Sequence, residues 1–324
     1  MQVTKNIFRR FRQYGGLRLM RQYAGLGALW PMAKDVLRNP FSRKAYKRGY
    51  MAALRVVEPF LREKYWPLMR ELAEGAKAQG CANRGSEPRP RIIWFCWLQG
   101  FENAPRIVKA CLASIRKNLP DREVKLIDAG NWREYVDLPN HIVCRWEKRQ
   151  IPPALFADLL RLQLLLRYGG TWMDATILCT GSEHTEEYLN ADLFMFQYTQ
   201  PGSSEWRGIG NWFITACPGN PVLKVLRDML FAYWKDYDCT LDYYIFHLFF
   251  SMLREVFPEE IAAMPYGYCV PSITLSYHLG EKFNQDNWDR FISKVSIHKI
   301  SYKLERSIID GKENYYNRIL NLYL

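Results

Sequence analysis

The chain has 324 residues, of which 48% are hydrophobic and 15% aromatic, so it can bury a large core. Its net charge of +12 is unevenly placed: residues 1–50 hold 12 Lys and Arg against one acid, Asp35, and the other residues hold 33 bases and 32 acids. This distribution argues against a nucleic-acid-binding body and favours a local anionic partner for the N-terminal segment.

The first predicted element is a basic amphipathic helix over residues 4–14. One of its faces carries four apolar or aromatic side chains: Ile7, Phe8, Phe11 and Tyr14. Such a helix can lie on an anionic membrane surface, or it can dock on its own domain and keep a solvated basic face. Because basic residues are concentrated there, we expect residues 1–50 to bind an anionic membrane surface.

A long helix is predicted over residues 44–79, broken near Pro59 and Pro67. The polar stretch 81–91 contains Pro and Gly and is the predicted domain boundary. The chain is therefore expected to comprise a basic helical segment, 1–88, and a larger domain, 89–324.

Targeting and cysteine patterns predict a cytoplasmic protein. No stretch reaches the roughly 18–20 uninterrupted apolar residues of a transmembrane helix, and arginines interrupt the N-terminal apolar residues, unlike a secretory signal. The eight cysteines form no CxxC pair, which is typical of reduced thiols. With the basic segment, this predicts a peripheral location on the inner face of the cell membrane.

From residue 91 onward, predicted strands alternate with predicted helices. The strands are expected at 91–100, 123–130, 171–178, 193–199 and 211–218. The helices are expected at 103–120, 131–136, 152–168, 221–237 and 241–257, with an irregular stretch before residue 152. This order predicts an α/β domain with a mainly parallel sheet, whose ligands bind at the carboxyl ends of the strands.

The stretch RYGGTWMDATILCT, residues 167–180, places Asp174 in a buried apolar strand. A carboxylate there is costly unless a cation or a metal pairs with it. In the preceding helix, Asp158 and Arg161 are three residues apart and share a face. By themselves these two residues suggest an intrahelical ion pair, but together with Asp174 they indicate a functional site.

Three stretches carry a resemblance to a known family: IIWFCWLQGFENAPRIVKACLASIRKNLP, FADLLRLQLLLRYGGTWMDATILCT and GIGNWFITACPGNPVL. They closely resemble the capsular polysaccharide synthesis glycosyltransferases, bacterial relatives of the α-mannosyltransferase and clostridial-toxin glucosyltransferase group. The resemblance runs from about residue 90 to about residue 304. It implies a GT-A fold, which is a Rossmann-like nucleotide-sugar-binding domain.

The resemblance also implies a function. A retaining hexosyltransferase would move a sugar from a nucleotide-sugar donor to a glycan or lipid-linked acceptor in bacterial capsule or surface polysaccharide synthesis. Two alternatives remain open at this point: a glycosyltransferase that modifies protein, and a catalytically inactive scaffold of a polysaccharide assembly complex.

The family pattern assigns catalytic roles to Asp174, Asp158 and Arg161. Asp174 matches the first aspartate of a D-x-D motif, and Thr176 stands where the second is common. With one carboxylate lost, Mn²⁺ or Mg²⁺ is expected to be weakly bound or dispensable. Asp174 and His298 are the candidate metal ligands.

Six residues are expected to bind the donor: Trp94, Trp97, Asn211, Thr176, Lys299 and Lys303. The two tryptophans match the segment that frames the nucleotide base, and on a strand they point to opposite faces, so at most one stacks on the base. Asn211 either binds the donor sugar or fixes a turn. The lysines in 296–304 either neutralise the diphosphate or lie on a solvated edge strand.

Overall fold

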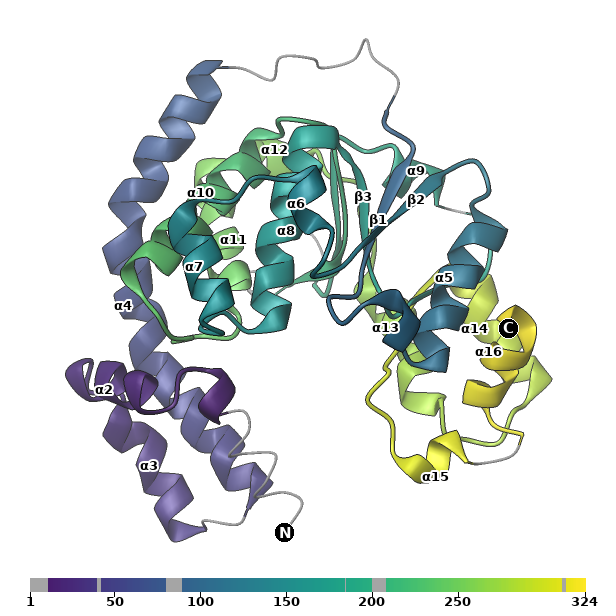
Figure 1. Cartoon of the computed structure of the whole chain (residues 1–324), viewed down its shortest axis with the longest axis horizontal. Helices are drawn as coiled ribbons and strands as arrows, with labels where there is room; N and C mark the ends of the chain where they lie inside the picture. Colours follow the sequence, from purple (N-terminus) through teal and green to yellow (C-terminus); the bar gives the residue numbers. More distant parts are fainter. Residues whose placement is uncertain (1–10, 40–41, 80–88, 184, 200–207, 311–312) are drawn as a thin grey trace. The chain divides into compact units, whose positions relative to one another are not determined.

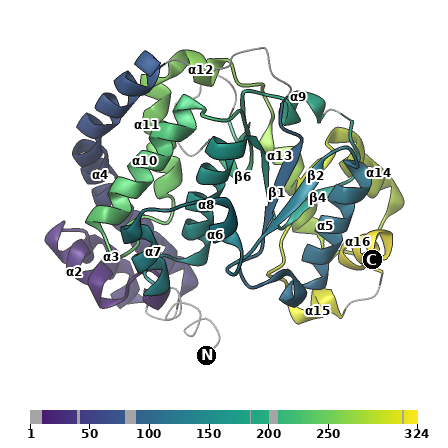
Figure 2. The ribbon, with the colours of Figure 1, turned by 45° about the horizontal axis from the view of Figure 1, so that its top comes forward.

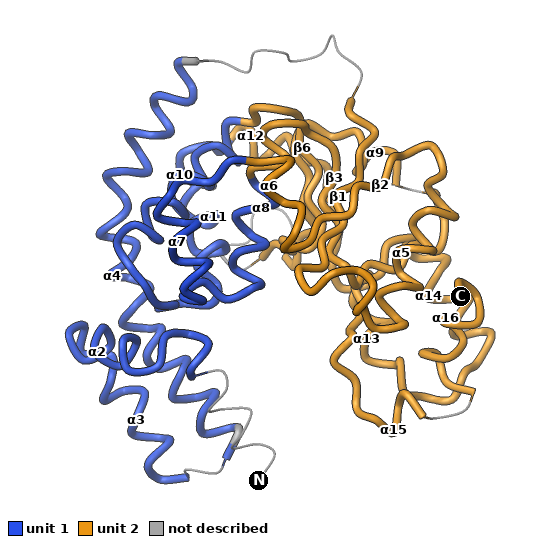
Figure 3. Tube along the Cα trace, in the orientation of Figure 1, with its two compact units in different colours: residues 1–80, 137–162, 221–258 blue, residues 81–136, 163–220, 259–324 orange. Residues whose placement is uncertain are grey.

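The computed structural model describes residues 11–39, 42–79, 89–183, 185–199, 208–310 and 313–324. The chain divides into two compact units, which Figure 3 distinguishes by colour. Unit 1 comprises Met1–Gly80, Asp137–Leu162 and Pro221–Pro258, and unit 2 comprises Cys81–Val136, Gln163–Asn220 and Glu259–Leu324. The expected boundary near residue 88 lies close to the first passage between units, but the N-terminal helices share their unit with two later segments.

Among the described residues of unit 1, all the regular secondary structure is helical. Its helices are α2 (Leu17–Gly25), α3 (Leu29–Arg38), α4 (Arg43–Gln79), α7 (Asn140–Glu147), α10 (Pro221–Asp236) and α11 (Ile245–Val256). The helix α4 packs against α3, α10 and α11, and α10 also contacts α7 (Figure 1). The helix α8 (Pro153–Tyr168) begins in unit 1 and ends in unit 2.

The helix α4 continues through Pro59 and Pro67, so the predicted breaks are wrong. Both prolines are exposed, as are Arg55 and Glu63, whose carbonyls lose a helical donor and can bond to water instead. The opposite face has buried side chains at intervals of three or four residues: Leu54, Val57, Leu61, Tyr65 and Met69. Packing of this apolar face holds the helix together across both prolines.

The described part of the N-terminal segment contributes to the core of unit 1. Tyr23 is fully buried, and its hydroxyl donates a hydrogen bond to the Leu241 carbonyl at 2.7 Å. The ring of Tyr14 lies 5.7 Å from that of Tyr243. Of the predicted amphipathic face, Ile7 and Phe8 lie outside the described residues.

Unit 2 is built around a five-stranded sheet with the order β2-β1-β3-β6-β5. Its strands are β1 (Ile92–Cys96), β2 (Glu123–Ile127), β3 (Gly170–Asp174), β5 (Leu193–Gln197) and β6 (Ile209–Ala216). The pairs β1–β2 and β1–β3 are parallel, whereas β6 is antiparallel to both β3 and β5. Four of these five strands therefore run in one direction, which confirms the predicted α/β class with a mainly parallel sheet.

Helices and a second small sheet surround this core. The longer helices are α5 (Arg106–Asn118), α13 (Cys269–His278), α14 (Gln285–Lys294) and α16 (Tyr315–Tyr323). The short ones are η1 (Phe101–Asn103), α6 (Trp132–Tyr135), α9 (Glu186–Leu189), α12 (Pro258–Ala262) and α15 (Arg306–Ile309). Figure 2 shows α16 beside α5, against which it packs, and the small sheet pairs β4 (Ile177–Cys179) with β7 (Ile297–Lys299).

Two predicted elements need correction. The single strand expected over 171–178 is two strands, because the chain turns at Ala175 and Thr176 and passes from the main sheet to the small one. The stretch expected to be irregular contains α7.

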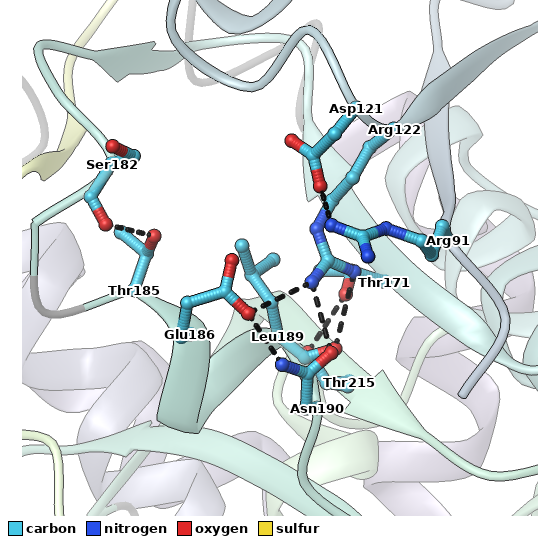
Figure 4. A network of polar contacts seen from close by, with 10 residues as sticks. All are labelled: Arg91, Asp121, Arg122, Thr171, Ser182, Thr185, Glu186, Leu189, Asn190 and Thr215. Carbon is cyan, nitrogen blue, oxygen red and sulfur yellow. Dashed lines mark hydrogen bonds and ion pairs between the residues drawn. The ribbon is translucent and has the colours of Figure 1, made fainter. Parts of the chain in front are cut away.

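The amino ends of β2 and β3 are held by a polar network (Figure 4). The buried Arg122 donates hydrogen bonds to Asn190 Oδ1 at 2.9 Å and to the Leu189 carbonyl at 3.4 Å, and Glu186 lies 3.7 Å away. These hydrogen bonds connect α9 and the residue after it to Arg122, the residue just before β2. The hydroxyls of Thr171 and Thr215, 2.9 Å apart, join β3 to β6. This edge of the sheet is therefore stabilised by internal polar contacts.

Among the described helices, none is long and apolar enough to cross a membrane. All the cysteines in the described residues are free thiols.

Candidate functional site

Three parallel strands end together at the other edge of the sheet. In the register of the sheet, Cys96 of β1 pairs with Ile127 of β2 and with Asp174 of β3. The residues that follow β1 and β2, Trp97 and Asp128, therefore lie at the same edge as Asp174. The carboxyl edge of a parallel sheet is where α/β proteins bind their ligands.

A Gly-Gly turn connects α8 to β3, the strand that ends at Asp174. Gly169 and Gly170 have φ values of 67° and 89°, in the left-handed region that glycine adopts without strain. A Cβ on Gly170 would also stand 2.5 Å from the Ile92 carbonyl oxygen. Glycine at both positions allows α8 to end at Tyr168 and β3 to begin immediately beside β1, so the turn fixes where Asp174 lies.

Asp174 is bound by two donors from different elements. Lys299 Nζ lies 2.7 Å from its Oδ2, and the indole nitrogen of Trp172 donates to its Oδ1 at 2.9 Å. Lys299 Nζ also lies 2.7 Å from Thr176 Oγ1. The Asp174 and Lys299 side chains remain about one quarter exposed, at 27% and 25%, so a ligand can reach both. The carboxylate anticipated from the sequence has an ammonium partner.

The small sheet brings Lys299 to this position. Lys299 pairs with Ile177 across β4 and β7, and the backbone N–H of Ile300 donates to the Thr176 carbonyl at 2.9 Å. The turn at 175–176 is therefore clamped to the segment that carries the lysine. The main sheet supplies the carboxylate and the small sheet supplies the cation.

His298 points away from this cluster, on the opposite side of β7 from Lys299. It is fully buried, and its Nε2 lies 3.1 Å from Thr180 Oγ1. Burial lowers the pKa of His298 to about 4, so the imidazole is neutral at physiological pH. The expectation that His298 joins Asp174 as a metal ligand is not met by this arrangement, because alternation along the strand turns the imidazole to the other face.

The two candidate tryptophans have different surroundings. Trp94 is 1% exposed, and its indole nitrogen donates to the Gly169 carbonyl at 2.9 Å, so it is a core residue that supports the Gly-Gly turn. Trp97 is half-buried and lines a small pocket with Phe101 and Asp128. The pocket measures about 10 Å³, roughly the space of one water molecule. Of the two, Trp97 is the more exposed.

Asp128 and Tyr302 belong to this edge and were missed by the sequence analysis. Asp128 Oδ1 accepts hydrogen bonds from the backbone N–H groups of Gly130 and Asn131, at 2.7 and 3.0 Å. Tyr302 sets its ring at 86° to that of Trp97, with centroids 5.0 Å apart. Asp128 lies near the carboxyl end of the strand predicted over 123–130, and this position was the available signal for it, whereas no local pattern indicated Tyr302.

The indole nitrogen of Trp97 is buried and has no hydrogen-bond partner among the described residues. Lys303, a predicted phosphate ligand, is exposed, and its Nζ lies 5.4 Å from the centre of the Tyr302 ring. Lys303 is thus near the Trp97 pocket through Tyr302, whereas Lys299 is the lysine that contacts Asp174.

Asn211 lies on β6, two residues before Phe213, which pairs with Met173. Because β6 runs antiparallel to β3, this places Asn211 just beyond the end of the ladder, at the edge where Asp174 ends β3. The predicted position of Asn211 near the site is consistent with this register.

Asp158 and Arg161 form their ion pair within unit 1. Arg161 Nη1 lies 2.9 Å from Asp158 Oδ1, and both side chains are less than 10% exposed. The guanidinium also lies 5.9 Å from the centre of the Phe246 ring. Removing either partner would leave the other charge buried and unpaired. Its contribution to ligand binding stays a prediction.

The donor set at Asp174 does not fit a resident metal ion. It offers one carboxylate and one hydroxyl, and the lysine ammonium lies on both. Within the described residues, no group of three or more His, Cys, Asp or Glu side chains is arranged to hold a metal. The site instead has a carboxylate–ammonium pair at the same sheet edge as the half-buried Trp97, and this pair can bind the hydroxyls and the anionic group of a ligand.

Comparisons with known proteins bear on what such a site does. The family model described as "Capsular polysaccharide synthesis protein" matches residues 41–319. The O-glycosyltransferase braB of Annulohypoxylon truncatum is 29% identical over an alignment of 160 residues, which covers 44% of this chain and 37% of that protein. The match thus spans little more than a third of that relative. Among solved structures, the PaToxG glycosyltransferase aligns over 83% of this chain and 98% of its own, at 14% identity and a TM-score of 0.38.

Proposed function

Because the chain belongs to the capsular polysaccharide synthesis protein family, we propose that it is a retaining glycosyltransferase. It transfers a hexose from a nucleotide-sugar donor, which binds at the carboxyl edge of the unit 2 sheet. The observation that carries the proposal is the Asp174–Lys299–Thr176 cluster, with two side chains still accessible at the end of β3.

The nucleotide base is assigned to the Trp97 pocket. Trp97 and Asp128 lie one residue beyond the strand ends, level with Asp174, so a nucleotide can extend from the pocket towards the cluster. The unsatisfied indole nitrogen of Trp97 offers a hydrogen-bond donor. Because the pocket holds about one water molecule, the side chains that line it have to move before a base enters.

Lys299 is assigned to the diphosphate. When the glycosidic bond breaks, negative charge develops on the leaving nucleoside diphosphate, and a positioned cation stabilises it. In the absence of donor substrate, Asp174 holds the Lys299 ammonium in place. When the donor substrate is bound, the Asp174 carboxylate accepts hydrogen bonds from the sugar hydroxyls. Mn²⁺ or Mg²⁺ is accordingly proposed to be weakly bound or dispensable, and activity should survive EDTA or need millimolar metal.

The acceptor and the setting are proposed from the family. A glycan or lipid-linked acceptor of bacterial surface polysaccharide synthesis, reached from the cytoplasmic side of the membrane, fits the family description. A protein acceptor is the alternative that a mass-spectrometric search for glycosylated protein would reveal.

The test is a donor-hydrolysis screen with full-length protein, a panel of nucleotide sugars, and either Mn²⁺ or EDTA. Release of nucleoside diphosphate from at least one donor is expected. The screen includes Asp174→Asn and the matched control Asp192→Asn, whose carboxylate pairs with Arg89 at the amino end of β5. If no donor is bound or hydrolysed, or if both variants lose activity equally, the proposal fails.

The stereochemistry has a separate readout. Proton NMR of the first sugar released during hydrolysis identifies its anomeric configuration before mutarotation. The same anomer as in the donor is expected, and the opposite anomer would rule out a retaining mechanism while leaving the donor site intact.

A further inference from the structure

The helix α3 has one exposed face that combines apolar and basic side chains. Trp30 and Leu37 are 68% and 70% exposed, although large apolar side chains are usually buried. Lys34 and Arg38 are also exposed. Residues 30, 34, 37 and 38 follow the i, i+4, i+7, i+8 spacing of a single helical stripe. These four residues are called the α3 face below.

The packing of α3 on α4 fixes the direction of this face. Gly49 of α4 is buried, and a Cβ there would stand 2.3 Å from the Met32 carbonyl oxygen and 3.2 Å from Val36 Cγ2. Met32 and Val36 are therefore on the side of α3 that touches α4. On the helical wheel this side is opposite to Trp30 and Leu37, so the α3 face points away from α4.

The surrounding charge identifies the chemistry of the partner. Asp35 is the only acid between residues 1 and 57, and it is neutralised by Arg48, whose Nε lies 3.4 Å from its Oδ2. Arg21, Lys44 and Lys47 are exposed bases near the α3 face in sequence, whereas Arg18 is paired with Asp238. An aromatic and an aliphatic side chain among an excess of exposed bases are typical of a helix that lies in the interface of an anionic bilayer.

We propose that the α3 face binds an anionic lipid bilayer, with Trp30 and Leu37 inserted among the headgroups and Lys34 and Arg38 facing lipid phosphates. Within the residues 1–50 that were expected to bind an anionic membrane, this assigns the contact to α3. It also makes the contact part of a packed unit, because α3 is held by α4. The proposal does not depend on the donor chemistry at Asp174.

The experiment measures binding of the full chain to vesicles of phosphatidylcholine, with and without phosphatidylglycerol, by co-sedimentation. Binding only to the anionic vesicles, weakening as salt rises, is expected. In Lys34→Gln/Arg38→Gln the partition coefficient should fall about thirty-fold, since each base near the leaflet contributes a factor of roughly five. The matched control is Arg290→Gln/Lys294→Gln, an exposed pair with the same i, i+4 spacing on α14, which should change binding less than twofold.

A second pair of variants tests the apolar contact. Trp30→Ala/Leu37→Ala should lose at least tenfold in partition coefficient, whereas Tyr277→Ala, which removes a ring that is 76% exposed on α13, should bind as the wild type does. Thermal unfolding of the Trp30/Leu37 variant should match the wild type, because both side chains are exposed.

Three results would overturn the proposal: no binding to either vesicle, equal binding to both, or equal losses in the α3 and control variants. A second copy of the chain, as an alternative partner, would give a different result. If Trp30→Ala/Leu37→Ala converts a self-associated protein to monomer in the absence of lipid, the α3 face is an interface between copies of the chain and the bilayer assignment is wrong.

Discussion

Asp174 shows how a carboxylate is accommodated at the end of an apolar strand. The sequence indicated that the residue needed a cation or a metal, and the structure supplies the Lys299 ammonium at 2.7 Å. The identity of this partner was not predictable, because 125 positions separate the two residues and only the pairing of β4 with β7 brings them together. The local sequence shows that a buried carboxylate needs a charged partner, whereas the identity of that partner depends on the fold.

Removing either charge of this pair should impair catalysis more than folding. For Asp174→Asn and Lys299→Met, we expect the rate of donor hydrolysis to fall by about 10²–10³, the typical effect of losing one electrostatic contact in the transition state. Melting temperatures should stay close to that of wild type, because both side chains are partly solvated. A loss of activity below tenfold, or one that follows a large drop in melting temperature, would make the pair structural.

The buried His298 should make stability depend on pH. Its pKa of about 4 in the folded protein lies below the roughly 6.5 of an unfolded chain, so the unfolded state binds more protons between these values. The stabilisation is complete above about pH 6.5 and is lost as the pH falls towards 4, by about 3 kcal/mol in total.

Urea unfolding of wild type and His298→Gln from pH 4 to pH 7 measures this contribution. The difference in unfolding free energy between the two proteins should shrink as the pH falls. A constant difference across the range would mean that His298 does not titrate in this way.

At the scale of elements, local patterns located most strands and helices of unit 2 but not their breaks. The strand predicted over 171–178 has an unbroken apolar pattern, and it divides because Ile177 pairs with Lys299 of another sheet. In unit 1 the prolines of α4 predicted breaks that packing overrides. In both cases tertiary contacts decide between conformations that the local sequence leaves close in energy.

Two glycines of α4 should respond in opposite ways to the same substitution. Gly49→Ala places a Cβ 2.3 Å from backbone of α3, so the helices must separate, and we expect a loss of about 1–3 kcal/mol in unfolding free energy. Gly75→Ala meets no atom within 4 Å and should stabilise the protein by about 0.5–1 kcal/mol, because alanine favours the helix. Urea unfolding of both variants provides the comparison, and the same sign for both would contradict the close packing of α3 on α4.

At the scale of the whole molecule, the basic N-terminal segment differs from the rest of the chain in charge, and its described residues belong to the same compact unit as two later segments. The hydrogen bond from Tyr23 to the Leu241 carbonyl joins that segment to a helical region more than 200 residues later. No local pattern encodes such a contact, so the sequence could not show that residues 11–79 help to form the core of unit 1.

The division of the chain has a consequence for synthesis on the ribosome. Unit 1 is assembled from three stretches, and its last one ends at Pro258, so its earliest helices must wait for that stretch to be translated. At about 5–20 residues per second this delay is roughly ten to thirty-five seconds, during which apolar residues of α4 such as Leu61 and Met69 lack the partners that bury them in the finished protein. The nascent chain is therefore a natural client for chaperones that shield apolar helices.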